Sequence, residues 1–455
     1  MSITEVAVTA SSTDPAVHIW DLRSGAVLGT LKGNKSNARA TATLPLPSHL
    51  GGALISSTFL AAQNDRGLVH AWNWAKAQLL TKFVLPENLT SLAMSNSGIY
   101  AVGGGQSGRV YIWQMNTGQL LRAFDGHYKA VKVIRFTTDD LAFITGGEDS
   151  VANVWLLAST IDPQADTDPS PHRSLSGHAL PITDIAVGVG LFGSARIFTS
   201  SADRTCKVWE ALSGDLLTTI VYHKPITSIA LDVTETRLFA GSSEGLIYRT
   251  NLYHRSAGGE AVGLRQGVDD IRSDESVLMG HSQSITSLAL SFDGSILLSG
   301  SIDGTAMVWD TTSSQALRTF STHKAPVTDV KILLKPPHLM DPSASAHNFF
   351  PIKPWARHVL PAGEVRHDPS VELPTLAGDL TSTSHPTTTL QPTFLTSISD
   401  KLRTLDSTPS ESALETAHAK LQQQVQQLQQ QNEQLVGIND ELYQGAVTVL
   451  MRDLA

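Results

Sequence analysis

The chain has 455 residues, of which 41% are hydrophobic, 16% charged and 6% aromatic, a composition typical of a folded globular protein. Its formal net charge of −9 argues against sequence-independent binding to nucleic acid or to an anionic membrane, because such binding needs a basic surface. Contact with RNA through a local basic patch stays open.

The chain shows no sign of secretion or of membrane insertion. Its N-terminal residues lack the basic start and apolar run of a signal peptide, and no eighteen consecutive residues are apolar. The single cysteine, Cys206, excludes an intramolecular disulfide and a thiolate zinc site, which fits a reducing compartment. We therefore expect an intracellular protein that does not span a membrane.

A repeated motif runs through most of the chain. In its three strongest copies an Asp stands six residues before a Trp, as in Asp303 and Trp309. Looser copies end at other Trp residues, and in a degenerate copy Thr250 stands where Trp is expected. The repeated Trp, or the residue in its place, falls at Trp20, Trp72, Trp113, Trp155, Trp209, Thr250 and Trp309.

A second element, Gly-His, precedes the Trp in each strong copy, and a His without the Gly is found at His223 and His323. Between the two elements lie short β-prone runs bounded by turn residues, which predict four strands per copy. With copies 41 to 59 residues apart, residues 1–334 resemble the WD-repeat β-propeller family. Seven copies imply an all-β, seven-bladed propeller.

The two ends of the repeat array predict how the ring closes. The first copy offers one strand around Thr4–Thr9 ahead of two more, so its blade lacks the innermost strand. After the seventh copy, Val327–Leu334 reads as a first strand without a blade of its own. We predict that Val327–Leu334 completes the blade that the N-terminus begins.

The three strongest copies share a His, a Thr or Ser, an Asp and a Trp, which could be taken for a nucleophile with its base and orienting acid. An active site is normally built once, whereas this set recurs at the repeat spacing. We therefore interpret it as a structural tetrad, the hydrogen-bonded chain that the resemblance implies for each blade. The predicted tetrads are His127, Thr145, Asp149, Trp155; His178, Thr199, Asp203, Trp209; and His281, Ser299, Asp303, Trp309.

No catalytic, cofactor or metal site is predicted. The run from Gly103 to Gly108 matches the glycine pattern of dinucleotide-binding loops, but a strand-like segment follows it where such a loop needs a helix. We interpret it as a hairpin of the third blade. The sixteen His residues lie at repeat positions or in the C-terminal linker rather than in a ligand cluster.

The composition changes at Lys335. Residues 335–409 hold 11 of the 21 prolines and long Ser/Thr-rich stretches, which predict a linker or strap that cannot order itself fully. Within it, the aromatic run from Phe349 to Trp355 is either a strap lying on the propeller or a docking motif for another protein.

Residues 410–455 carry a heptad pattern, which predicts an α-helical coiled-coil segment. The helix could pair with a second copy of the chain, pair with another protein's helix, or fold back on the propeller. Asn residues at two core positions are a known device for choosing register and a two-stranded state. The predicted pairing residues are Leu414, Leu421, Val425, Leu428, Asn432, Leu435, Asn439, Leu442 and Val449.

The layout of propeller, Pro-rich linker and C-terminal heptads resembles the WD-repeat subunit of the nuclear complex that processes pre-ribosomal RNA in large-subunit precursors. The resemblance implies a non-catalytic scaffold in the nucleolus or nucleoplasm. Its implied partners are a helical-repeat scaffold protein, other subunits of the pre-ribosomal complex, an AAA ATPase remodeller and a second copy of the chain. The alternative is a signalling scaffold or a substrate-recruiting adaptor of a ubiquitin ligase. Such adaptors usually carry a recruiting domain before the propeller, for which we expect no room here.

Overall fold

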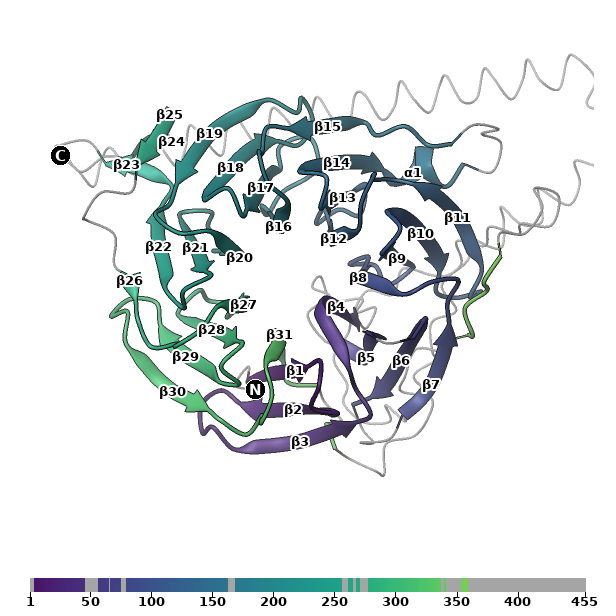
Figure 1. Cartoon of the computed structure of the whole chain (residues 1–455), viewed down its shortest axis with the longest axis horizontal. Coiled ribbons are helices and arrows are strands. Elements are labelled where there is room, and N and C mark those ends of the chain that lie inside the picture. The colour runs from purple at the N-terminus through teal and green to yellow at the C-terminus, as the bar shows by residue number, and fades with distance from the viewer. Residues whose placement is uncertain are drawn as a thin grey trace, which may run out of the picture. The chain divides into compact units, whose positions relative to one another are not determined.

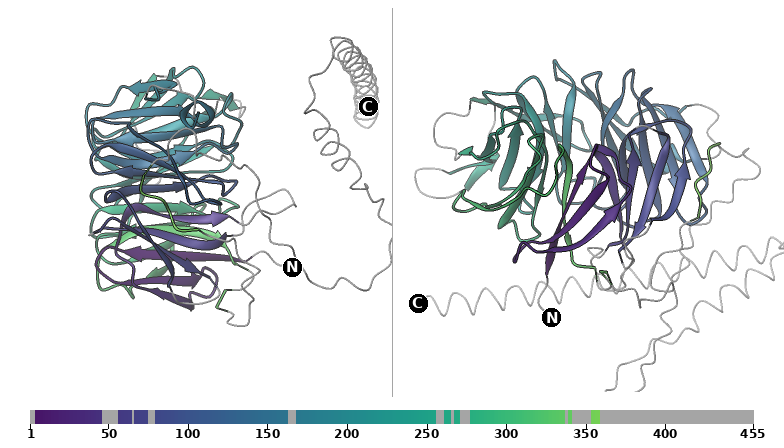
Figure 2. Two further views of the ribbon diagram at one scale, coloured as in Figure 1. Left: turned by 90° about the vertical axis from the view of Figure 1, so that its right-hand side faces the viewer. Right: turned by 60° about the horizontal axis from the view of Figure 1, so that its bottom comes forward.

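Seven β-sheets are arranged radially around a central axis in the computed structural model of the chain (Figure 1). The structure describes residues 4–45, 56–64, 66–74, 79–162, 168–255, 261–264, 267–270, 277–336, 339–340 and 353–358. Two further views show the strands running from one face of the ring to the other (Figure 2). The predicted seven-bladed, all-β propeller is therefore confirmed.

Each blade has four antiparallel strands, which we give from the central axis outward. The innermost strands are β31 (Val327–Leu334), β4 (Ser36–Pro45), β8 (Leu89–Met94), β12 (Val131–Phe136), β16 (Ile182–Val187), β20 (Ile226–Leu231) and β27 (Ile285–Leu290). The second strands are β1 (Glu5–Ser11), β5 (Ser56–Gln63), β9 (Tyr100–Gly105), β13 (Ala142–Gly147), β17 (Arg196–Ser201), β21 (Arg237–Ser242) and β28 (Ile296–Ser301). The third strands are β2 (Ala16–Asp21), β6 (Leu68–Asn73), β10 (Arg109–Gln114), β14 (Val151–Leu156), β18 (Thr205–Glu210), β22 (Ile247–Asn251) and β29 (Ala306–Asp310). The outer strands are β3 (Val27–Lys32), β7 (Leu79–Val84), β11 (Leu120–Asp125), β15 (Arg173–Ser176), β19 (Leu216–Val221), β26 (Val277–Leu278) and β30 (Ala316–Phe320).

The remaining elements are insertions. A single helical turn, α1 (Leu157–Thr160), separates β14 from β15. Between β22 and β26 the chain forms the hairpin of β23 (Tyr253–Arg255) and β24 (Ala261–Leu264), and then β25 (Gly267–Asp270). Strand β25 pairs in parallel with β19 and gives the fifth blade a fifth strand.

The ring closes as the sequence predicts. Strand β31 pairs antiparallel with β1, from Glu5 opposite Leu334 to Ala10 opposite Asp329, and so completes the first blade from the C-terminal end of the array. The first blade therefore joins segments more than 300 residues apart in sequence, and strand pairing holds the ring shut.

The hydrophobic core lies between neighbouring blades. One cluster joins Val110 and Phe124 of the third blade to Val131 and Phe143 of the fourth. Neighbouring blades cover both faces of each sheet, so the second strands are almost entirely buried. Every residue of β13, for example, is buried. Glycines make room where blades come closest: a Cβ on Gly104 would lie only 2.5 Å from the Cβ of Val131 in the next blade.

No helix within the described ranges is long and apolar enough to cross a membrane. The predicted coiled-coil segment, residues 410–455, lies outside the described residues, as does most of the predicted linker or strap, residues 335–409. Of that linker the structure describes residues 335–336, 339–340 and 353–358.

Candidate functional site

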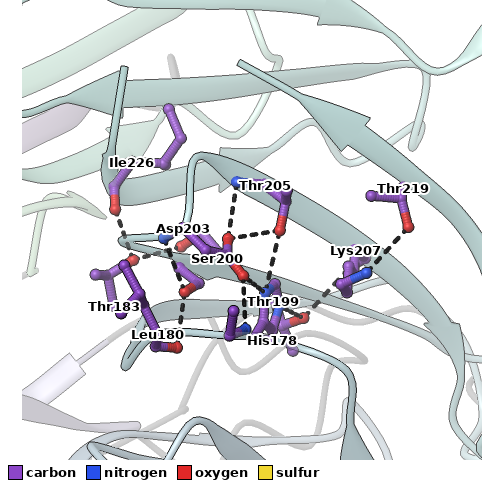
Figure 3. A network of polar contacts seen from close by, with 12 residues as sticks. His178, Leu180, Thr183, Thr199, Ser200, Asp203, Thr205, Lys207, Thr219 and Ile226 are labelled. Atoms are coloured by element: carbon purple, nitrogen blue, oxygen red, sulfur yellow. Dashed lines mark hydrogen bonds and ion pairs between the residues drawn. The ribbon is translucent and has the colours of Figure 1, made fainter. Parts of the chain in front are cut away.

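Each predicted tetrad forms one hydrogen-bonded chain across its blade. In the fifth blade, His178 Nδ1 lies 2.9 Å from Asp203 Oδ2, and its Nε2 lies 2.8 Å from Thr199 Oγ1 (Figure 3). The indole N–H of Trp209 donates to the same Thr199 hydroxyl at 2.9 Å. The Asp203 carboxylate also accepts a bond from the backbone N–H of Ala179, so the tetrad fixes the loop that enters the blade.

The other two tetrads repeat this geometry. The His ring is 2.7 Å from the hydroxyl in both, through His127 to Thr145 and through His281 to Ser299. It is 3.1 Å from the carboxylate of its blade, and the Trp N–H donates to the hydroxyl at 2.8 to 2.9 Å. The hydroxyl-bearing residues are fully buried, so no substrate reaches them. The arrangement suits a structural link rather than a nucleophile.

In the seventh blade, the pKa values of the tetrad His and Asp are shifted in directions that suit a structural role. Burial lowers the pKa of His281 against the opposing pull of Asp303, which keeps the ring neutral at neutral pH. Burial acts to raise the pKa of Asp303, but hydrogen bonds from the Thr305 hydroxyl and the backbone, with a smaller charge interaction with His281, outweigh it and hold that pKa low. A neutral ring beside an ionised carboxylate gives a fully satisfied buried pair.

A fourth tetrad, which the sequence analysis missed, lies across the ring closure. His323 Nε2 is 2.8 Å from Thr9 Oγ1, and His323 Nδ1 is 3.0 Å from Asp14. The indole of Trp20 donates to Thr9 at 3.0 Å. The signal was present, because Asp14 stands six residues before Trp20 as in the strong copies. Its His, however, comes from the opposite end of the repeat array.

Ring closure also gathers possible metal ligands. Among the residues that the structure describes, donor atoms of Asp14, His18 and His323 lie within 4.8 Å of one another. The sequence shows no such cluster, because Asp14 and His323 come together only in the closed ring. The pKa of His18 is lowered by burial and by the neighbouring His323. Asp14 and His323 are already hydrogen-bonded to each other, as in the other tetrads.

The sixth blade corrects one assignment. The sequence predicts His223 as its repeat His, but His223 is exposed. In the complete tetrads the His stands four residues before the innermost strand, and counting back from Ile226 gives Tyr222. The Tyr222 hydroxyl lies 3.1 Å from that of Thr250, the residue in place of Trp. In this blade a buried Tyr–Thr hydrogen bond joins the positions that His and Trp occupy in the complete tetrads.

The glycine-rich run of the third blade forms the predicted hairpin. Gly103–Gly105 belongs to β9, which pairs with β10 directly after the turn. A Cβ on Gly103 would lie 2.6 Å from Leu89 and 3.0 Å from Trp113, so side chains fill the space above this glycine. The strand that follows offers no helix N-terminus for a phosphate.

Threonines line the end of the central channel at which the innermost strands begin, a side we call the upper face. Thr183, Thr227 and Thr286 occupy equivalent positions in successive blades, and each donates its hydroxyl to a backbone carbonyl of the next blade at 2.5 to 2.8 Å. Lys132 stands at this position in the fourth blade and pairs with Glu148 at 2.6 Å. A cavity of about 460 Å³ is lined by the three threonines, Lys132 and Arg39.

Arg39 crosses the channel from the second blade to the fifth. Its Nε lies 2.9 Å from Asp184, and its guanidinium donates to the carbonyl of Thr227 at 2.5 Å. Burial acts to raise the pKa of Asp184, but Arg39 and Arg135 hold it below the usual range. Since Asp184 also accepts from Ser228, the channel charges serve to link blades.

Exposed apolar side chains on the loops of the two faces form the remaining candidate for a binding surface. On the upper face, the Tyr128 side chain is 98% exposed beside its tetrad. On the opposite, lower face, exposed apolar side chains recur in the first hairpin turns of the fourth to seventh blades. They are Leu141, Val189, Leu191, Val233 and Phe292. Contiguous loops of this kind suit contacts with other proteins.

The predicted helix-pairing residues, from Leu414 to Val449, lie outside the described residues. For the aromatic run in the linker, the structure describes Lys353–His358, where Trp355 is buried against the second and third blades.

Comparison with known proteins supports the fold and indicates relatives. The family profile described as "WD domain, G-beta repeat" matches residues 118–155, 169–210 and 273–310, the three copies with predicted tetrads. The chain is 36% identical to "WD repeat-containing protein 18" of Homo sapiens over 371 residues, 80% of this chain and 81% of that protein. It is 32% identical to "Protein ROOT INITIATION DEFECTIVE 3" of Arabidopsis thaliana over 74% of this chain and 73% of that protein. It is 35% identical to "Pre-rRNA-processing protein IPI3" of Yarrowia lipolytica over 60% of this chain and 64% of that protein.

Proposed function

The chain belongs to the WD-repeat propeller family of WD repeat-containing protein 18 and pre-rRNA-processing protein IPI3, and we propose from this that it is a non-catalytic assembly subunit in ribosome biogenesis. The observation that carries the proposal is that the repeated polar residues bond to other parts of the propeller. All four His–Asp pairs and the charges of the channel link parts of the ring to one another. The loops of the two faces are left to bind partners.

The finer proposal follows the resemblance seen in the sequence. The protein serves in the nucleus in maturation of the large ribosomal subunit precursor, and binds a helical-repeat scaffold protein. It pairs with a second copy through residues 410–455 and helps to dock an AAA ATPase remodeller. The net charge of −9 suits a subunit whose contacts are mainly with protein, because an extensive phosphate interface needs basic surface.

The test is depletion of the protein in cells that make it, with pre-rRNA followed by hybridisation probes. We expect precursors that retain the second internal transcribed spacer to accumulate, and tagged full-length protein to co-purify with large-subunit precursor particles. Normal pre-rRNA levels together with recovery of ubiquitin-ligase subunits would contradict the proposal and favour the adaptor alternative.

A further inference from the structure

The third blade keeps the Trp of the tetrad but lacks its three polar partners. Leu85, Gly103 and Ser107 stand at the positions that His, Thr or Ser, and Asp occupy in the complete blades. Its Trp113 is nevertheless fully buried, and a buried indole N–H needs an acceptor. The acceptor is the backbone carbonyl of Ala356, at 3.0 Å, from a segment more than 200 residues away in sequence.

Ala356 makes a second backbone hydrogen bond to the third blade. The backbone N–H of Ala356 donates in return to the carbonyl of Gly118, in the turn between β10 and β11, at 2.7 Å. Figure 1 shows this piece of chain, residues 353–358, in green beside β7 and β11. The two bonds hold the segment by its backbone, and one of them satisfies the donor that the missing tetrad leaves open.

An aromatic stack adds to these bonds. Trp355 lies between Phe83 of the second blade and Trp113 of the third, with ring centroids 4.8 Å away on each side and interplanar angles of 11° and 19°. Only 5% of Trp355 is exposed, whereas its neighbours Lys353, Pro354 and Arg357 are exposed. The segment thus inserts one large apolar side chain between two blades, which is how a peptide anchor fills a groove.

The groove is shaped for the segment's backbone. Gly118 has a φ of +72°, and a Cβ there would lie 2.2 Å from the carbonyl oxygen of Pro354. A second anchor lies upstream, where the backbone N–H of Met340 donates to the carbonyl of Trp74 at 2.9 Å. The chain that leaves β31 is therefore held first at the second blade and then between the second and third blades.

We propose that the groove formed by Phe83, Trp113 and Gly118 is a docking site for the chain's own residues 353–358, which replace the tetrad of the third blade. The folded unit then extends beyond the WD array to residue 358. The last described residues of the linker, 353–358, thus lie at the second and third blades rather than at the first, where the array ends. This assignment stands independently of the role in ribosome biogenesis.

The test compares full-length variants by trypsin cleavage after Arg357 and by hydrogen exchange of the third blade. With Trp355→Ala, which empties the groove, we expect cleavage after Arg357 and exchange in β10 and β11 to rise at least about tenfold. Trp355→Phe, which keeps an aromatic ring, recovers most of the protection. Unchanged cleavage and exchange in Trp355→Ala would overturn the proposal.

A second pair of variants changes the propeller rather than the docked segment. Gly118→Ala places a methyl group against Pro354 and should release the segment as Trp355→Ala does. Gly214→Ala is the matched control, because Gly214 occupies the same turn in the fifth blade at a φ of +79°, and among the described residues an added Cβ there would meet the Arg173 side chain rather than the linker. Equal cleavage after Arg357 in the two variants would contradict the proposal. A loss of molecular mass by light scattering in Trp355→Ala would mean that the groove holds a second copy's segment, which overturns docking within one chain.

Discussion

The buried hydroxyl of Ser299 accepts the Trp309 N–H and bonds to His281, so loss of one partner leaves another buried polar group unsatisfied. We expect His281→Ala to lower the free energy of unfolding by about 1–3 kcal/mol in urea titrations. His223→Ala is the control, because that His is exposed and should change stability little. Equal effects of the two substitutions would contradict a structural tetrad.

The tetrad of the seventh blade also predicts acid sensitivity. His281 has a pKa below 6.5 in the folded chain, so the unfolded chain takes up its proton first and stability falls as pH drops through 6.5. The pKa of Asp303 lies below 3.8, so a second loss follows as pH falls below that value. Thermal midpoints measured from pH 8 to pH 3 should decrease in both windows. A midpoint that rises between pH 7 and pH 5.5 would count against a neutral buried His281.

At the scale of elements, one strand pair holds the ring shut. Deleting residues 1–12 removes β1, with which both β2 and β31 pair, together with Thr9 of the fourth tetrad. We expect the whole propeller to lose stability in a single transition, seen as a lower thermal midpoint by circular dichroism. An unchanged midpoint would show that the remaining blades hold the ring without this pairing.

At the scale of elements, some features could be predicted from the sequence and others could not. Local repeats gave the blades, the three tetrads and the closing strand, because strand period and turn residues are encoded within a few residues. The fourth tetrad needed a His from the far end of the array. In the sixth blade, His223 matches the repeat His in residue type, but it lies one residue after the His position, which Tyr222 occupies. For Trp355 the sequence offered a strap lying on the propeller as one of two alternatives, and the structure places Trp355 on the propeller. The blades it contacts could not be named, since they become neighbours only after the ring is built.

At the scale of the molecule, the heptads of residues 410–455 predict self-pairing. We expect light scattering to give the mass of a dimer for the full chain and of a monomer for the double variant Leu428→Glu, Leu435→Glu. Exchanging Gln for Glu at Gln430, outside the predicted seam, is the control and should leave the mass unchanged. A monomeric wild-type chain would contradict self-pairing, and would mean that the helix pairs with another protein's helix or packs on its own propeller.

The pairing of β31 with β1 has a consequence for synthesis of the chain. Translation makes β1 near the start of the propeller and β31 at its end, so β1 keeps one open edge until about 330 residues have been added. At ribosomal speeds of about 5–20 residues per second, that interval is on the order of tens of seconds. An unpaired strand edge is a template for pairing with other chains, so the nascent propeller is most exposed to aggregation just before its last strand emerges.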